Sequence, residues 1–259
     1  MPSPGSVLVV GGSRGLGAAL VDLYSAQSSV EVYATHRGHE RPGGDKNVKW
    51  LDHVDLMHPS VGENLVKHLQ GVEISTIYIT AGIFIREEFD KGGPDWDAEV
   101  RTYHTSAIAP PVIIHALVKA NNLIKGAKIV LVSSEAGSIT LRTEGGGDYA
   151  HHGSKSALNM VGKQLSYDLE LLGIAVGIIH PSFMRTEMTK GVGFDVAYDE
   201  HGALKPEEAA EILSKWTDNE LDMKKSGEFW APRGTRDIGS WNVVYGKETQ
   251  KEGPVQLPW

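Results

Sequence analysis

The sequence predicts an α/β protein built on a doubly wound parallel sheet of seven strands, with helices on both faces. Short apolar runs alternate along the chain with amphipathic stretches of helical length, which is the order of successive βαβ units. The apolar runs are continuous instead of alternating with polar residues. This pattern is expected of strands that are covered on both faces of a parallel sheet.

The predicted elements can be placed by residue number. The strands are expected at 6–10, 30–35, 48–51, 74–79, 127–132, 174–180 and 227–230. The helices are expected at 15–27, 59–70, 97–121 and 152–172. No internal repeat or linker interrupts this order, so residues 1–259 are expected to form one domain. The long stretch after the sixth strand predicts a substrate lid around 183–205, and the polar tail 246–259 is either frayed or docked on a partner subunit.

Composition excludes several classes of function. The chain has 259 residues, a net charge of −8 and no block of like charges, so nothing supports binding to nucleic acid or to an anionic membrane. It has no cysteine and no H-E-x-x-H pattern, and no metal site is expected. The N-terminus lacks the features of a signal peptide, and no apolar run approaches the roughly 20 residues of a membrane span. We therefore expect a cytoplasmic protein that acts on a small molecule.

A glycine-rich turn separates the first strand from the first helix. In "VLVVGGSRGLGAAL", Gly11, Gly15 and Gly17 have the spacing G-x-x-x-G-x-G. Glycines let the backbone approach a pyrophosphate, and the helix N-terminus offers free N–H groups and a positive dipole end. The context favours a Rossmann-type dinucleotide site over a plain glycine turn. The other loop residues expected to touch the cofactor are Ser13, Arg14 and Leu16.

Charge near the second strand favours NADP(H) over NAD. A site that prefers NAD uses an acid near the end of this strand to hold the ribose hydroxyls. Here the strand ends in "YATHRG" with Arg37 and no acid, and Arg14 lies near the same ribose. Two cations suit a 2′-phosphate, although both could also be solvated surface arginines. Asp55, followed by Leu56, is expected near the adenine, with a helix cap as the alternative role for Asp55.

Five segments, in order and spacing, resemble the short-chain dehydrogenase/reductase family and, within it, the C-factor-like branch. They are "GGSRGLG", "ITAG" (79–82), "VSSEAGS" (132–138), "SKSALNM" (154–160) and "HPSFMRTEM" (180–188). The resemblance implies an oxidoreductase that uses a nicotinamide cofactor, with contacts from Ala81, Gly82, Pro181 and Thr186. It also implies a homodimer or homotetramer that assembles through helices 97–121 and 152–172.

The catalytic set of that family is Asn, Ser, Tyr and Lys, and this chain matches two of the four. Ser134 takes the serine place, where the resemblance implies a hydrogen bond to the substrate carbonyl oxygen. Lys155 takes the lysine place, where it would bind the nicotinamide ribose and lower the pKa of the proton donor. Ser106 stands in the asparagine place, and His151 stands in the tyrosine place.

The proton donor is therefore open between three possibilities. His151 would be a good acid as an imidazolium, with an ordinary pKa of about 6.5, but the charge of Lys155 one helical turn away should lower that pKa. Tyr149 is the rival donor if the helix begins near 152 and the preceding chain is extended. The third possibility is a site with no donor of its own, which an imine or a conjugated alkene would tolerate better than a carbonyl.

The sequence as a whole predicts an NADPH-dependent short-chain oxidoreductase that reduces a small organic carbonyl or imine. One alternative is a catalytically degenerate scaffold or sensor that binds NADP. Another is a cyclase or isomerase derived from the same family, for example one that couples imine reduction to cyclisation in secondary metabolism.

Overall fold

The computed structural model describes residues 5–38 and 47–259, which form an eight-stranded sheet in the order β3-β2-β1-β4-β5-β6-β7-β8. The strands are β1 (Gly5–Val10), β2 (Val30–Thr35), β3 (Val48–Leu51), β4 (Ile74–Ile79), β5 (Leu123–Val132), β6 (Ala175–Ile179), β7 (Phe229–Ala231) and β8 (Val255–Gln256). All neighbours pair in parallel except β7 and β8, which are antiparallel. The predicted doubly wound α/β class is confirmed, and the predicted count of seven strands was one too few.

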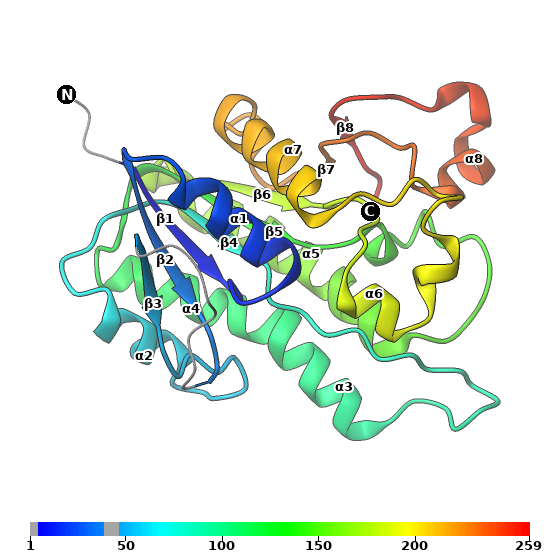
Figure 1. The fold of residues 1–259 in the computed structure, drawn as a ribbon, viewed down its shortest axis with the longest axis horizontal. Helices are drawn as coiled ribbons and strands as arrows, with labels where there is room; N and C mark the ends of the chain where they lie inside the picture. The colour runs from blue at the N-terminus through cyan, green and yellow to red at the C-terminus, as the bar shows by residue number, and fades with distance from the viewer. Residues whose placement is uncertain (1–4, 39–46) are drawn as a thin grey trace.

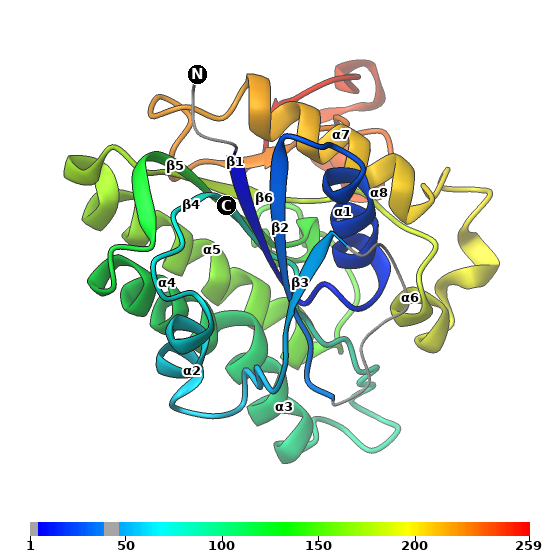
Figure 2. The same cartoon turned by 60° about the vertical axis from the view of Figure 1, so that its left-hand side comes forward.

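Helices cover both faces of the sheet (Figures 1 and 2). On one face, α1 (Gly15–Ser25) and α7 (Pro206–Asn219) pack together over a core that includes Leu20, Tyr78 and Trp216. The other face carries α2 (Val61–His68), α4 (Ala109–Lys119) and α5 (Tyr149–Leu169) over the larger core. Within the described ranges, no helix is long and apolar enough to cross a membrane.

The helix predicted at 97–121 is three consecutive pieces. They are α3 (Trp96–Tyr103), a π-helical turn η1 (His104–Ile108) and α4. Pro110 and Pro111 have no N–H, so the carbonyl groups of Ser106 and Ala107 lose the donors four residues on. The wider π turn accommodates that loss, and such turns are frequent at functional sites.

Helix α5 begins at Tyr149, three residues before the predicted start. The backbone N–H of Ala150 donates to the Glu87 carboxylate (2.7 Å), and the Asp148 carboxylate accepts from the N–H of Glu87 (3.0 Å). A carboxylate from a distant segment thus satisfies one of the free N–H groups of the first turn. The extended approach on which the alternative role of Tyr149 depended is therefore absent, and nothing in the local sequence shows this cap.

The C-terminal tail is docked on its own chain. β8 pairs with β7, Leu257 is buried, and the ring of Trp259 stacks on Phe229 with 5.9 Å between ring centroids. The Ser138 hydroxyl donates to the Pro258 carbonyl (2.8 Å), and the Thr140 N–H donates to the Trp259 carbonyl (2.9 Å). The tail therefore fastens the segment that follows β5, and neither of the two predicted states describes it.

Candidate active site

A cavity of about 800 Å³ opens at the carboxyl ends of β1, β4, β5 and β6. The strand order reverses between β1 and β4, and ligands of open parallel sheets bind at such a point. Most of the residues singled out from the sequence line this cavity. They are Gly11, Ser13, Arg14, Gly15, Leu16, Gly17, Arg37, Asp55, Leu56, Ala81, Gly82, Ser134, His151, Lys155, Pro181 and Thr186.

The glycine-rich turn is packed so tightly that side chains are excluded at Gly11 and Gly17. Gly11 has φ +92°, and a Cβ there would lie 2.8 Å from the backbone nitrogen of Ala81. A Cβ on Gly17 would overlap the carbonyl oxygen of Gly11 and lie 2.7 Å from Oγ1 of Thr80. The loop thus rests directly on the end of β4 and presents backbone at the N-terminus of α1. This is the cradle that a pyrophosphate requires, so the chain fits a dinucleotide.

Two arginines line the adjoining end of the cavity. Arg14 precedes α1, and Arg37 follows β2. The last residue of β2 is Thr35, whose hydroxyl accepts from the N–H of Gly11 (2.9 Å). Asp55 also lines this end, and one oxygen of its carboxylate accepts from the N–H of Met57 (3.0 Å). Asp55 therefore stabilises a local turn and does not cap α2, which begins at Val61 with Ser60 in the cap position.

Lys155 is buried beneath the centre of the cavity. It lies on α5, and its Nζ donates to the carbonyl oxygen of Val132 at the end of β5 (2.8 Å). Burial lowers the pKa of Lys155 to about 8, so the side chain is still mainly charged at pH 7. The site therefore holds a positive charge next to the ends of β4 and β5.

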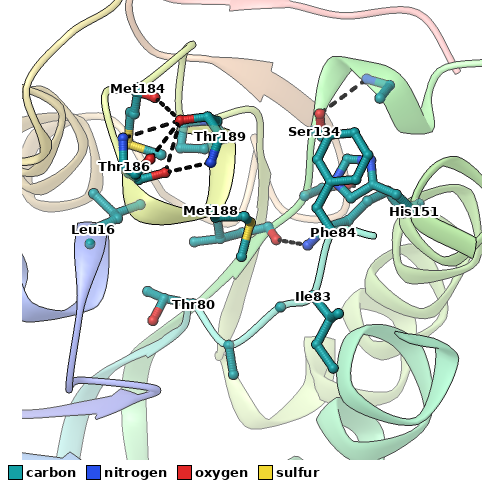
Figure 3. A pocket seen from close by; sticks show the side chains of 18 of the residues that line it. Leu16, Thr80, Ile83, Phe84, Ser134, His151, Met184, Thr186, Met188 and Thr189 are labelled. Carbon is teal, nitrogen blue, oxygen red and sulfur yellow. Dashed lines mark hydrogen bonds between the residues drawn. The ribbon is translucent and has the colours of Figure 1, made fainter. Parts of the chain in front are cut away.

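His151 lies in the cavity wall and is held in its neutral form. Its ring stacks on Phe84, with 4.1 Å between ring centroids and 13° between planes (Figure 3). Burial, and then the charge of Lys155, lowers the pKa of His151 to about 3. The sequence predicted a lowering by Lys155, and burial is the larger cause. An imidazole in this state is a poor acid at neutral pH.

Two sequence-predicted residues do not reach the cavity. Tyr149, in the first turn of α5, is 39% exposed and is absent from the described cavity wall. Ser106 is buried in η1, and its hydroxyl has no hydrogen-bond partner in the described part of the chain. Its neighbour Thr105 lines the cavity instead.

Sequence reasoning missed a group of charged side chains behind Ser134. The Ser134 hydroxyl donates to Oε2 of Glu135 (2.7 Å), which lies 3.1 Å from Nδ1 of His180. Nε2 of His180 lies 3.4 Å from the fully buried carboxylate of Asp237. Glu135 and His180 fall inside segments that carry the family resemblance, so they could have been noticed. Asp237 carried no signal, because it lies 57 positions after His180 in the chain.

These groups determine one another's charge. Burial alone would lower the pKa of His180, but the carboxylates of Glu135 and Asp237 reverse the effect and raise it to about 10. Burial alone would raise the pKa of both carboxyl groups, but His180 outweighs it and holds them below their usual ranges. The result is an imidazolium between two carboxylates at neutral pH.

The opposite end of the cavity is mostly apolar. The segment 183–205, predicted as a lid, forms α6 (Glu187–Gly191) and η4 (Phe194–Ala197). A bridge between Met184 and Leu204 closes the segment into one unit. It contributes apolar and aromatic side chains to the wall, and Figure 3 shows Met184 and Met188 among them. Its contributions to the wall include Phe183, Met184, Met188, Phe194 and Ala197.

A dinucleotide cradle beside a half-buried serine and a buried lysine indicates a nicotinamide-dependent oxidoreductase of the α/β class. The sequence model of the short chain dehydrogenase family matches residues 6–196, and this chain belongs to that family.

Similar proteins agree with this assignment. A 1-hydroxy-2-glutathionyl-2-methyl-3-butene dehydrogenase from Rhodococcus sp. (strain AD45) is 30% identical over 233 residues, or 89% of this chain and 97% of that one. C-signal of Myxococcus xanthus is 33% identical over 99 residues, which cover 38% of this chain and 58% of C-signal. The NADPH-bound carbonyl reductase from chicken fatty liver has a TM-score of 0.72 and 26% identity, covering 87% of this chain and 95% of that one.

Proposed function

We propose that this protein is an NADPH-dependent oxidoreductase that reduces a small organic carbonyl or imine. The observation that carries the proposal is that one cavity joins the glycine cradle, two arginines, Ser134 and Lys155. The NADPH bound to the chicken carbonyl reductase supports the same choice of cofactor.

Each part of the cofactor has residues suited to it. The loop from Gly11 to Gly17 would hold the pyrophosphate, and Arg14 and Arg37 would hold the 2′-phosphate. Lys155 would bind the nicotinamide ribose. The remaining contacts would come from Asp55, Leu56, Ala81, Gly82, Pro181 and Thr186. Bound NADPH supplies hydride to an electrophilic carbon, and the side chains of the chain must hold that carbon and deliver the proton.

Ser134 would orient the substrate oxygen or nitrogen, and the apolar side chains that the segment 183–205 contributes to the cavity wall would exclude water. His151, in its neutral form and stacked on Phe84, would orient the substrate instead of protonating it. Tyr149 remains the rival donor of the original prediction, but its exposed place at the start of α5 argues against that role.

The protein would assemble through its α3–η1–α4 and α5 surfaces. Ile108, Val112, Met160 and Tyr167 expose 40% or more of their surface there. Burying such side chains against a second copy would stabilise a homodimer or homotetramer.

The function is tested by following NADPH oxidation with a panel of aldehydes, ketones, imines and enones. Wild-type protein should turn over at least one carbonyl or imine, and Ser134→Ala should lower kcat by about 100-fold because the electrophile loses its hydrogen bond. NADPH affinity, measured by fluorescence, should stay within threefold in this variant. Tight NADPH binding without turnover of any electrophile would instead support the scaffold or sensor, which the neutral His151 in the tyrosine place also favours.

Cofactor preference is tested at the two arginines. Arg37→Ala and Arg14→Ala should each raise the Kd for NADPH about tenfold, the equivalent of one charge-assisted contact to phosphate, and should leave the Kd for NADH nearly unchanged. Isothermal titration calorimetry with both cofactors measures this. Arg101→Ala, an exposed arginine on α3, is the matched control. Equal losses for NADPH and NADH would contradict recognition of a 2′-phosphate.

A further inference from the structure

Three ionisable groups converge behind Ser134 from distant parts of the chain. Glu135 begins the 3-10 turn η2 (Glu135–Gly137), His180 directly follows β6, and Asp237 precedes α8 (Gly239–Tyr245). The side chains of His180 and Asp237 are 5% and 0% exposed, whereas that of Glu135 is 35% exposed because it opens into the cavity. Burying a charge costs free energy unless the charge is paired. These three paired charges connect an interior imidazole to the substrate cavity, which suggests a role in catalysis.

The hydroxyl of Ser134 already donates and accepts a hydrogen bond within this group of residues. It has one proton, which it donates to Oε2 of Glu135 (2.7 Å), and its oxygen accepts from the N–H of Ala136 (3.2 Å). Ser134 therefore has no proton to donate to a substrate while Glu135 is a carboxylate. It becomes a donor toward the cavity only when Glu135 carries a proton and donates to it in turn.

His180 is placed to exchange a proton with Glu135. Its Nδ1 lies 3.1 Å from Oε2 of Glu135 and 3.1 Å from the backbone nitrogen of the same residue. A protonated Nδ1 can donate to the carboxylate, and a deprotonated Nδ1 can accept from the backbone N–H. Nδ1 is thus hydrogen-bonded both before and after it gives up a proton, which is what a relay requires.

Asp237 fixes the far side of the imidazole. Its carboxylate faces Nε2 of His180, accepts from the N–H of Phe183 and lies 4.0 Å from the guanidinium of Arg233. The other titratable group that acts on Glu135 is the neutral His151. Between the two carboxylates His180 is protonated at neutral pH and can act as an acid. Its raised pKa of about 10 equals the ordinary value for a tyrosine phenol.

We propose that Glu135 and His180 form a proton relay that returns a proton to the hydroxyl of Ser134. The relay replaces the proton donor that is missing from the tyrosine place. Asp237 is the positioning residue of this relay. The proposal rests on the reductase function proposed above. It accounts for a site in which His151 is neutral and Tyr149 lies outside the cavity wall.

The Nδ1–H bond of His180 breaks and Oε2–H of Glu135 forms, so Glu135 donates to the oxygen of Ser134 and the Ser134 hydroxyl can donate toward the cavity. Addition of hydride to a carbonyl carbon moves the C=O electron pair onto oxygen, and that oxygen takes the proton of Ser134 as its new O–H bond forms. Oε2–H of Glu135 then breaks as the O–H bond of Ser134 re-forms. Glu135 returns to a carboxylate, and neutral His180 takes a proton from water through the open cavity. The net change is one proton from water to the product.

The test uses Glu135→Gln, which keeps the size of the side chain and a hydrogen-bonding group beside Ser134 but cannot carry a transferable proton. Because Glu135 faces the cavity, this variant should fold. We expect kcat for a carbonyl to fall by at least about 100-fold, the usual contribution of a general acid, while KM and the Kd for NADPH stay within threefold. Glu170→Gln, an exposed carboxylate just after α5, is the matched control and should behave like wild type.

A second readout does not depend on turnover. In NMR spectra of histidine labelled at 13Cε1, one signal should remain that of an imidazolium through pH 8, and it should be absent from His180→Gln. In Glu135→Gln the same signal should titrate at least one pH unit lower, because the larger of the two stabilising charges is gone. A neutral His180 at pH 7 in wild type would overturn the relay.

The two proposals fail in different ways. Turnover by wild type with kcat of Glu135→Gln within threefold overturns the relay and leaves the reductase function standing. Absence of turnover by wild type with every electrophile overturns the reductase function and the relay with it. A fall in NADPH affinity that parallels the fall in kcat would assign Glu135 a binding role and also overturn the relay.

Discussion

Lys155→Met should lower kcat by about 100- to 1,000-fold, because it removes the buried positive charge that lies next to the ends of β4 and β5. The loss should appear in kcat for the best electrophile of the panel, together with a weaker affinity for NADPH. Lys119→Met, on the exposed end of α4, is the control and should retain both properties. Turnover of Lys155→Met within threefold of wild type would contradict the proposed site.

The same substitution should make the folded protein more stable at neutral pH. Burial lowers the pKa of Lys155 from 10.5 to about 8, so the unfolded chain binds this proton more tightly than the folded chain. Above pH 10.5 the lysine is neutral in both states and does not lower the free energy of unfolding. That free energy falls as the pH falls, and the loss is complete below pH 8, where the lysine is charged in both states. At about 1.4 kcal/mol per pH unit, the displacement corresponds to about 3 kcal/mol.

Methionine avoids that penalty and loses only the hydrogen bond to Val132, worth about 1 kcal/mol. We therefore expect Lys155→Met to unfold with about 2 kcal/mol more free energy than wild type at pH 7, and the advantage should shrink by pH 10. Urea denaturation at both pH values measures this. If the variant is less stable than wild type, and by the same amount at pH 7 and at pH 10, burial does not destabilise the charged form of the lysine.

The parts of the fold that sequence could predict are those determined locally. The strands β1 and β4 are buried at every residue except Gly5 and Ser75, and the glycine turn after β1 has the shape that its spacing indicated. Strand β8 was missed because two residues, Val255 and Gln256, leave no periodic signal. Only the presence of β7 and Phe229 beside them makes a strand there.

The candidate site divides in the same way. Ser134 and Lys155 could be found because each lies in a recognisable segment, and both line the cavity. The start of α5 depends on Glu87, which is 62 residues away from Tyr149. The pairing of His180 with Asp237 likewise depends on chain folding that no local pattern reports. Contacts between charged residues that are distant in the chain therefore could not be predicted from the sequence.

Gly17→Ala should be the most damaging single change in the glycine loop. The new methyl group would overlap the carbonyl oxygen of Gly11 and press on Oγ1 of Thr80, which itself donates to the carbonyls of Val10 and Gly11. Backbone cannot move aside as a flexible side chain can, so the loop must leave the end of β4. We expect a loss of about 3 kcal/mol in the free energy of unfolding, in the range for overpacked cores.

The effect of NADPH on stability gives a second measurement for Gly17→Ala. NADPH at about 100 times its Kd should stabilise wild type by about 2.7 kcal/mol, because it binds only the folded protein. Gly17→Ala should lose most of that increment as well, since the displaced loop no longer presents its N–H groups to the pyrophosphate. Gly191→Ala is the control, because a Cβ on Gly191 in α6 meets nothing within 4 Å. Thermal denaturation with and without NADPH separates the two effects, and an undiminished NADPH increment in Gly17→Ala would place the pyrophosphate elsewhere.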